Sequence, residues 1–364
     1  MKEIRTIVQA YRSIDFTQTR AALATVVRVE GSSYRRAGAR MLVLDDGTYL
    51  GGISGGCLEG DALRRAQKGI ALGRPSVITY DTTQDDDYQI GVGLGCQGII
   101  DVLFTPLHPE DPTNPISILG ALTHTRHAVA VIAITGTSDS SILGHTRLYD
   151  DPAIFEKAFP LPARVPALHT DIRDALAAGQ SKSVAYDDVK VFIEVILPAT
   201  HIVAYGGNYD IRTLLVQAKE LGWDTTVVLN TARVDRSLIA AATTVIDSKG
   251  NDSPVIDAYT AVLLMSHDYR SDSLNLKKVL PSVASYIGLL GPRKRAQKIF
   301  DALAEEGLHL TESQLQRIYA PAGLDIGAAT PEEIALSILA EVRSHFAGRQ
   351  GMPLRLRQGS IYGS

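Results

Sequence analysis

The stretch that decides the fold of the second half is His201-Ile202-Val203-Ala204-Tyr205, followed by Gly206-Gly207-Asn208-Tyr209-Asp210-Ile211. An apolar run that ends in a glycine turn and continues into a helical pattern indicates a strand, a tight turn and a helix. Further apolar runs, with helical patterns between them, cover residues 225–229, 243–246, 261–265 and 285–290. This alternation predicts an α/β protein whose residues 199–348 form a Rossmann-like, doubly wound parallel sheet.

The glycine turn departs from the dinucleotide fingerprint G-x-G-x-x-G at its second and third glycines, which here are Asn208 and Ile211. The second glycine lets a pyrophosphate approach the backbone, and the Asn208 side chain would stand in that space. Asn208 tolerates a left-handed backbone, so the turn itself is expected to form. The next strand ends in Asn230 instead of an acidic, ribose-binding residue. We therefore do not expect NAD(P) binding, and keep Gly206, Gly207 and Asn208 as candidate cofactor contacts.

Three other polar groups in the second half are candidates for a site. Ser266-His267-Asp268 follows the apolar run 261–265, where His267 is either a hydrogen-bonding or acid–base residue or a loop histidine satisfied by a neighbour. Pro292 suits the first position of a predicted helix, and Arg293, Lys294 and Arg295 in its first turn indicate either a phosphate site or a solvated basic helix start. Asp325, between Gly323 and Gly327, either points into a site or closes a turn. Thr330-Pro331-Glu332-Glu333 reads as a structural capping box.

The first half contains the only two cysteines of the chain, and both lie among glycines. Cys57 lies in Ser54-Gly55-Gly56-Cys57-Leu58-Glu59, and Cys96 lies in Gly93-Leu94-Gly95-Cys96. Flanking glycines leave a sulfur uncovered, which predicts a reactive or ligand-binding thiol. A predicted helix over 58–68 places positive helix-end dipoles near Cys57 and favours its thiolate. A disulfide between the two cysteines is an alternative.

The rest of the first half predicts a mixed α+β domain over residues 1–115, with strands over 21–30, 41–44, 76–80 and 98–104. Arg35, Arg36 and Arg40 follow Gly31-Ser32-Ser33-Tyr34, and arginine is suited to bidentate phosphate binding, although an ordinary exposed loop is the alternative. Residues 116–198 read as a linking α/β unit, and residues 349–364 as a C-terminal tail.

Composition excludes several classes of protein. The chain has 364 residues, of which 45% are hydrophobic and 21% charged, and this is typical of a globular protein with two or three domains. Its net charge of −4 argues against nucleic-acid binding, and it contains neither a membrane-span-length apolar run nor a signal peptide pattern. Two cysteines fit a reducing compartment, so we expect a cytoplasmic location.

At these residues the sequence resembles the xanthine dehydrogenase accessory protein family, XdhC/CoxI. The similar motifs are the run from Gly31 to Met41, Ser54 to Glu59, Gly93 to Gly98, Tyr286 to Arg293, Ala320 to Gly327 and Thr330 to Ala335. They lie at both ends of the chain and in the family's order, while the middle unit carries none of them. The family usually has G-A-G-H or G-A-G-D after the first Rossmann strand, and Gly206-Gly207-Asn208-Tyr209 departs from that pattern.

The resemblance implies a molybdenum-cofactor chaperone that binds molybdopterin, supports its sulfuration and delivers it to apo xanthine dehydrogenase or a related molybdenum hydroxylase. It implies a cysteine desulfurase as the sulfur source, and we also expect a homodimer. Cys57 and Cys96 are then candidate molybdenum ligands, and the glycine turns would offer N–H groups to the pterin phosphate. Glu59 becomes either a partner for the pterin ring or a helix-dipole-stabilised carboxylate. The alternative function is an NAD(P)-dependent oxidoreductase, and the third is a thiol redox protein, which the lack of C-x-x-C disfavours.

Overall fold

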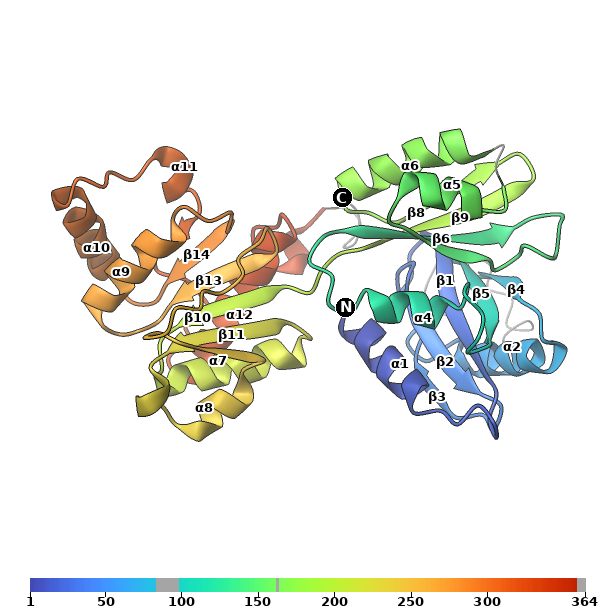
Figure 1. The fold of residues 1–364 in the computed structure, drawn as a ribbon, viewed down its shortest axis with the longest axis horizontal. Helices are drawn as coiled ribbons and strands as arrows, with labels where there is room; N and C mark the ends of the chain where they lie inside the picture. Colours follow the sequence, from blue (N-terminus) through green and yellow to red (C-terminus); the bar gives the residue numbers. More distant parts are fainter. Residues whose placement is uncertain (83–97, 162–163, 359–364) are drawn as a thin grey trace. The chain divides into compact units, whose positions relative to one another are not determined.

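The computed structural model describes residues 1–82, 98–161 and 164–358. The chain folds as two compact units that divide between Pro198 and Ala199 (Figure 1). Within the described ranges, no helix has both the length and the apolar character that a membrane span requires.

Among the described residues, the first unit contains two antiparallel sheets. The larger has the order β3-β2-β1-β5-β4 and is centred on β1, which pairs with β2 and β5. Its strands are β1 (Ala21–Gly31), β2 (Arg40–Leu44), β3 (Tyr49–Gly51), β4 (Ser76–Asp81) and β5 (Gly98–Leu107). Strands β1, β2, β4 and β5 begin and end within three residues of the ranges that apolar patterning predicts.

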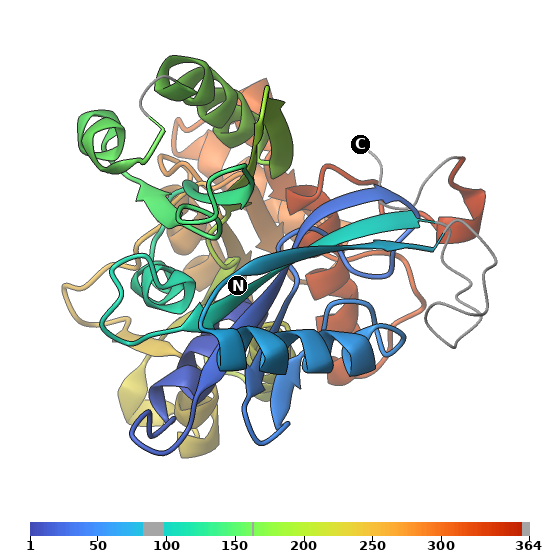
Figure 2. The same cartoon turned by 90° about the vertical axis from the view of Figure 1, so that its right-hand side faces the viewer.

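The two faces of β1 pack against different helices because side chains alternate along a strand. Ala22, Ala24 and Val26 pack against α2 (Glu59–Leu72), whereas Ala21 and Leu23 pack on the side of α1 (Lys2–Arg12). In Figure 2, α2 is the mid-blue helix that lies along the front of this sheet. This packing places the start of α2, and the loop before it, at one end of the sheet.

The second sheet has the order β7-β6-β9-β8. Its strands are β6 (Val129–Gly136), β7 (Thr146–Tyr149), β8 (Lys182–Tyr186) and β9 (Val189–Ile196), and the helices nearby are α4 (Pro115–Ala121), α5 (Pro152–Ala158) and α6 (Val165–Ala178). Helices α5 and α6 cover one face. On the other face, Ala133 and Phe192 pack against Val27 and Leu103 of the larger sheet, so residues 1–198 form one compact unit.

The second unit is built on a six-stranded parallel sheet with the order β12-β11-β10-β13-β14-β15 among the described residues. Its strands are β10 (His201–Tyr205), β11 (Asp224–Leu229), β12 (Thr244–Asp247), β13 (Thr260–Leu264), β14 (Tyr286–Leu289) and β15 (Ile318–Tyr319). Numbered within this unit, the order is 3-2-1-4-5-6, which is that of the Rossmann fold. The predicted fold class is thereby confirmed. The strand order reverses between β10 and β13, and ligands of such sheets bind at this switch point.

Helices cover both faces of this sheet, as doubly wound folds require (Figure 1). One face is covered by α7 (Tyr209–Glu220), α8 (Arg236–Ala241) and α12 (Pro331–Phe346), and the other by α9 (Tyr269–Val279) and α10 (Arg293–Glu305). The shorter pieces are α11 (Glu312–Leu315), η2 (Thr231–Arg233) and η3 (Leu354–Leu356). The capping box predicted at Thr330 and Glu333 is confirmed, with Pro331 in the first turn of α12. Pro292, by contrast, is the residue before α10 rather than its first residue.

Candidate functional site

Cys57 lies at the tip of a short loop between β3 and α2. Its side chain is exposed and its sulfur is free. Gly55 and Gly56 have φ of +99° and +123°, a backbone conformation that residues with a Cβ rarely adopt. Leu58 is the N-cap of α2, so Cys57 is the residue immediately before the helix cap. The predicted exposure of this sulfur is confirmed.

The Glu59 carboxylate holds this loop in shape. It accepts backbone hydrogen bonds from Ile53 at 3.0 Å, Ser54 at 2.9 Å, Gly55 at 3.1 Å and Gly56 at 2.8 Å. The Ser54 hydroxyl donates to the same carboxylate at 2.5 Å. Five donors that converge on one carboxylate fix four consecutive residues, which makes the loop before Cys57 rigid.

The ionisation of Glu59 reflects these contacts. Burial of the side chain, which is 8% exposed, would by itself raise the pKa of Glu59. Hydrogen bonds from Ser54 and Gly55 to the charged form outweigh burial and lower the pKa from 4.5 to about 2. The sequence left Glu59 as a candidate partner for a ligand ring, and the structure corrects this. Because its oxygens are already bound to the loop, Glu59 supports the site without lining it.

The prediction that Arg40 contacts a phosphate is also corrected, because Arg40 has a structural role. It is 4% exposed and forms an ion pair with Glu194 of β9, while its Nη1 donates to the carbonyl of Gly38 at 2.6 Å. Its charge is therefore matched inside the protein. Arg35 is partly buried and forms an ion pair with Glu3 of α1. Neither arginine presents an uncompensated charge to a phosphate.

Cys96 and Gly95 lie outside the described residues, so the pairing of Cys57 with Cys96 at a metal stays a prediction. Over residues 1–82, 98–161 and 164–358, there is no group of three or more His, Cys, Asp or Glu side chains placed to hold a metal ion.

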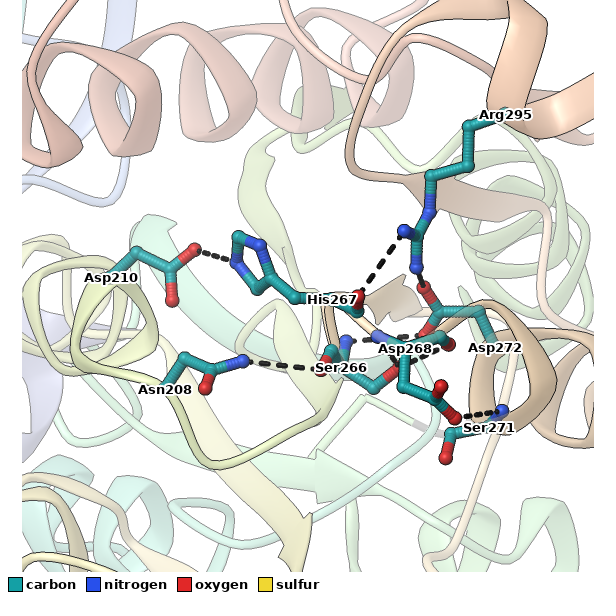
Figure 3. Close-up of polar contacts among 8 residues, drawn as sticks. All are labelled: Asn208, Asp210, Ser266, His267, Asp268, Ser271, Asp272 and Arg295. Carbon is teal, nitrogen blue, oxygen red and sulfur yellow. Dashed lines mark hydrogen bonds and ion pairs between the residues drawn. The ribbon is translucent and has the colours of Figure 1, made fainter.

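A second group of predicted residues meets at the switch point of the parallel sheet (Figure 3). Gly206 directly follows β10 and has φ of +140°, and a Cβ there would lie 2.5 Å from the carbonyl oxygen of Met265. Asn208 has an extended backbone, with φ of −87°, and not the left-handed conformation that the sequence allowed. Its side-chain amide donates to the carbonyl of Ser266 at 3.2 Å. The turn after β10 is thus tied directly to the turn after β13.

His267 and Asp210 make a second link across the same place. His267 Nε2 lies 2.7 Å from Asp210 Oδ2, and Asp210 stands in the first turn of α7 with its side chain 11% exposed. Its other oxygen accepts from the Ile211 N–H at 3.0 Å. His267 is one of two non-glycine residues with positive φ among the described residues, at +57°. His267 is thus hydrogen-bonded to a neighbouring carboxylate, and a role as an acid–base residue stays a prediction.

Arg295 fixes the backbone of this turn. It donates to the His267 carbonyl at 3.3 Å and pairs with Asp272 at 2.6 Å (Figure 3). Asp272 is 2% exposed and also accepts from the Ser266 N–H and hydroxyl, at 3.1 and 2.6 Å. One of the three cations at the start of α10 is therefore already neutralised within the protein.

We do not expect the switch point to bind a dinucleotide. The Asn208–Ser266 hydrogen bond bridges the two turns, and the Asp210 carboxylate stands at the helix start where a pyrophosphate would need positive potential. We expect calorimetric titration with NAD⁺ and NADP⁺ to show no binding tighter than about 1 mM, the weak end of enzyme affinities. A saturable, micromolar isotherm with either nucleotide would contradict this account of the switch point.

Two predicted residues lie apart from both groups of contacts. Arg293 begins α10 and is exposed, so its assignment to a phosphate stays a prediction. Asp325 is exposed in the loop that follows β15. That loop is held from behind, because the Gly323 N–H donates to Glu341 at 2.8 Å and the Ser337 hydroxyl donates to the Leu324 carbonyl at 2.5 Å.

Comparison with known proteins finds an XdhC family model that matches a part of each half of the chain. Residues 17–81 match the family model described as "XdhC and CoxI family", and residues 202–342 match the one described as "XdhC Rossmann domain". These ranges contain the Cys57 loop and the switch point.

Relatives and a solved structure resemble most of the chain. It is 29% identical to a probable xanthine dehydrogenase subunit of Bacillus subtilis, over 89% of this chain and 93% of the relative. It is 25% identical to the molybdenum cofactor insertion chaperone PaoD of Escherichia coli, over 89% and 83% of the two chains. The crystal structure of a xanthine dehydrogenase from Bacillus halodurans matches with a TM-score of 0.74 and 26% identity, covering 97% and 98% of the chains. The chain therefore belongs to the XdhC and CoxI family.

Proposed function

We propose that this protein is an accessory factor in the maturation of molybdenum enzymes, which binds molybdenum cofactor and delivers it to xanthine dehydrogenase or a related hydroxylase. The names of two relatives, a molybdenum cofactor insertion chaperone and a probable xanthine dehydrogenase subunit, support this role. The cofactor is cargo in this proposal. We propose that the cofactor binds to the N-terminal domain, residues 1–115. In this proposal residues 116–198 form a linking unit, residues 199–348 the Rossmann-like domain and residues 349–364 a C-terminal tail.

The observation that carries the proposal is the exposed Cys57 thiol on a loop fixed by Glu59. A thiolate is a soft ligand that suits a late-delivered metal centre. Exposure allows a second protein to reach the cargo. Because the loop is already rigid, binding of the cargo does not have to order it and loses little conformational entropy. A site that must both hold and release its cargo needs these two properties together.

The loop before Cys57 offers fewer N–H groups to the cofactor phosphate than its glycines predict. The N–H groups of residues 53–56 bind Glu59, and the N–H of Leu58 donates to the Ser54 hydroxyl at 2.8 Å. These groups are therefore used within the loop. In our proposal Ser54, Gly55 and Gly56 shape the loop, and the thiol makes the contact with the metal.

Sulfuration is the finer part of the proposal. We propose that the cofactor held at Cys57 exchanges one oxo ligand for a terminal sulfido ligand before delivery. The sulfur comes from the persulfide of a cysteine desulfurase, a thiol reductant supplies the two electrons that convert it to sulfide, and the oxygen leaves as water. The support for this step is the exposure of the thiol, which leaves room for a sulfur donor beside the cargo. A homodimeric state and a cytoplasmic location stay predictions.

A transfer experiment tests the proposal. The protein is incubated with molybdenum cofactor, freed of unbound cofactor by gel filtration, and mixed with apo xanthine dehydrogenase. We expect hydroxylase activity to appear faster than with the same amount of free cofactor, because bound cargo is protected and presented. If no molybdenum elutes with the protein, or if bound cofactor never activates the apoenzyme, the proposed role is wrong.

A further inference from the structure

We infer that Tyr34 is the residue that contacts the pterin ring system of the cargo, beside the thiol that holds the metal. This inference rests on the proposed function, since it assumes that molybdopterin is bound at Cys57. It concerns a residue that the resemblance and the comparisons leave without a role.

The position of Tyr34 is set by its contact with the cysteine loop. A Cβ at Gly55 would lie 2.6 Å from Cδ1, 3.0 Å from Cε1 and 3.1 Å from Cγ of the Tyr34 ring. One side of the ring therefore lies directly against the backbone of Gly55. Cys57 follows two residues later, so its Cα is at most about 7 Å from that of Gly55. The Tyr34 ring therefore lies against the loop that carries Cys57.

The neighbours of Tyr34 are anchored, while the part of its ring that faces away from Gly55 is exposed. Ser33 is 4% exposed, and Arg35 is tied to Glu3 by an ion pair. The Tyr34 side chain between them is 65% exposed, and among the described contacts its hydroxyl has no hydrogen-bond partner. An aromatic residue whose base is fixed and whose ring is open offers a ready surface for another flat ring.

The chemistry of the cargo matches this arrangement. Molybdopterin binds the metal through a dithiolene on its pyran ring, and the flat pyrimidinone ring of the pterin lies at the other end of the fused system. Fused heterocycles stack on aromatic side chains, and the interaction depends on the ring face and not on the tyrosine hydroxyl. Cys57 would hold the metal end and Tyr34 the ring end, so the two contacts together select this cofactor over a bare metal ion.

The test compares cofactor binding by the wild type, Tyr34→Phe and Tyr34→Leu. Molybdenum cofactor released from a purified molybdenum enzyme is the probe, and bound pterin and bound molybdenum are both measured after gel filtration at several concentrations. We expect Tyr34→Phe to bind like the wild type and Tyr34→Leu to bind at least about 5-fold more weakly, the lower bound for loss of one stacked ring. Tyr49→Leu is the matched control, because Tyr49 is 50% exposed on β3, outside this contact.

Each outcome decides a separate question. Equal binding by the wild type and Tyr34→Leu overturns the role of Tyr34 and leaves the proposed function standing. Absence of binding by the wild type overturns both. Weaker binding by Tyr34→Phe, equal to that of Tyr34→Leu, would show that the hydroxyl and not the ring makes the contact, which also contradicts the inference. Thermal unfolding of each variant shows whether it is folded as the wild type is.

Discussion

Glu59→Gln is expected to lower the free energy of unfolding at pH 7 by about 3 kcal/mol and to weaken cofactor retention by about 10-fold. The carboxylate receives four backbone N–H groups and the Ser54 hydroxyl. An amide has only one oxygen, and its NH₂ group would face donors. The loop before Cys57 would lose its shape, while the thiol itself is unchanged.

The pKa of Glu59 gives both the magnitude and the pH range. A fall from 4.5 to about 2 corresponds to about 3 kcal/mol that favours the folded, ionised form. Because the folded pKa is the lower one, this contribution is complete above about pH 5 and is lost as the pH falls from 4.5 toward 2. Denaturant unfolding at pH 7 and pH 3 measures it.

The control for this prediction is Glu110→Gln, which removes an exposed carboxylate in the same unit. We expect that variant to unfold like the wild type at both pH values. The difference between the wild type and Glu59→Gln should shrink at pH 3. Unfolding curves for Glu59→Gln that match the wild type at pH 7 would show that the carboxylate does not hold the loop.

Cys57→Ala is expected to weaken binding of molybdenum cofactor by about 100-fold or more, because the metal–sulfur bond is lost outright. The side chain is exposed, so the free energy of unfolding should change by less than about 0.5 kcal/mol. Binding is measured by gel filtration and metal analysis, and stability by denaturant unfolding.

The combination of results separates Cys57 from Glu59. Cys57→Ala should lose binding alone, whereas Glu59→Gln should lose binding and stability together. Cys57→Ser, which places a harder oxygen ligand at the same point, should resemble Cys57→Ala. If Cys57→Ser binds the cofactor as well as the wild type, the thiol is not the metal ligand.

Much of the fold could be predicted because buried strands are marked by continuous apolar runs. Strand β10 begins and ends at the predicted residues, His201 and Tyr205. Strands β7 and β8 were not predicted, because they are sheet edges whose residues are largely only partly buried and include polar side chains. Strand β15 has two residues and is too short to carry a periodic signal.

The site was predicted less completely, because the partners of its charged residues lie far along the sequence or on the backbone. Arg40 pairs with Glu194, 154 residues away, and a sequence pattern does not show that pairing. Glu59 binds backbone N–H groups. Every residue except proline has such a group, so the residue types around Glu59 do not reveal its partners. Asn208 was correctly recognised as a departure from the dinucleotide fingerprint, but its bond to Ser266 depends on the order of strands in the sheet.

The most direct test of the central claim, that Cys57 holds the cofactor, is the molybdenum and pterin content of the protein after incubation with molybdenum cofactor and gel filtration. The wild type, Cys57→Ala and Cys96→Ala are measured side by side. The account predicts that the wild type retains both molybdenum and pterin and that Cys57→Ala retains neither above background. Equal retention by the wild type and Cys57→Ala would contradict it.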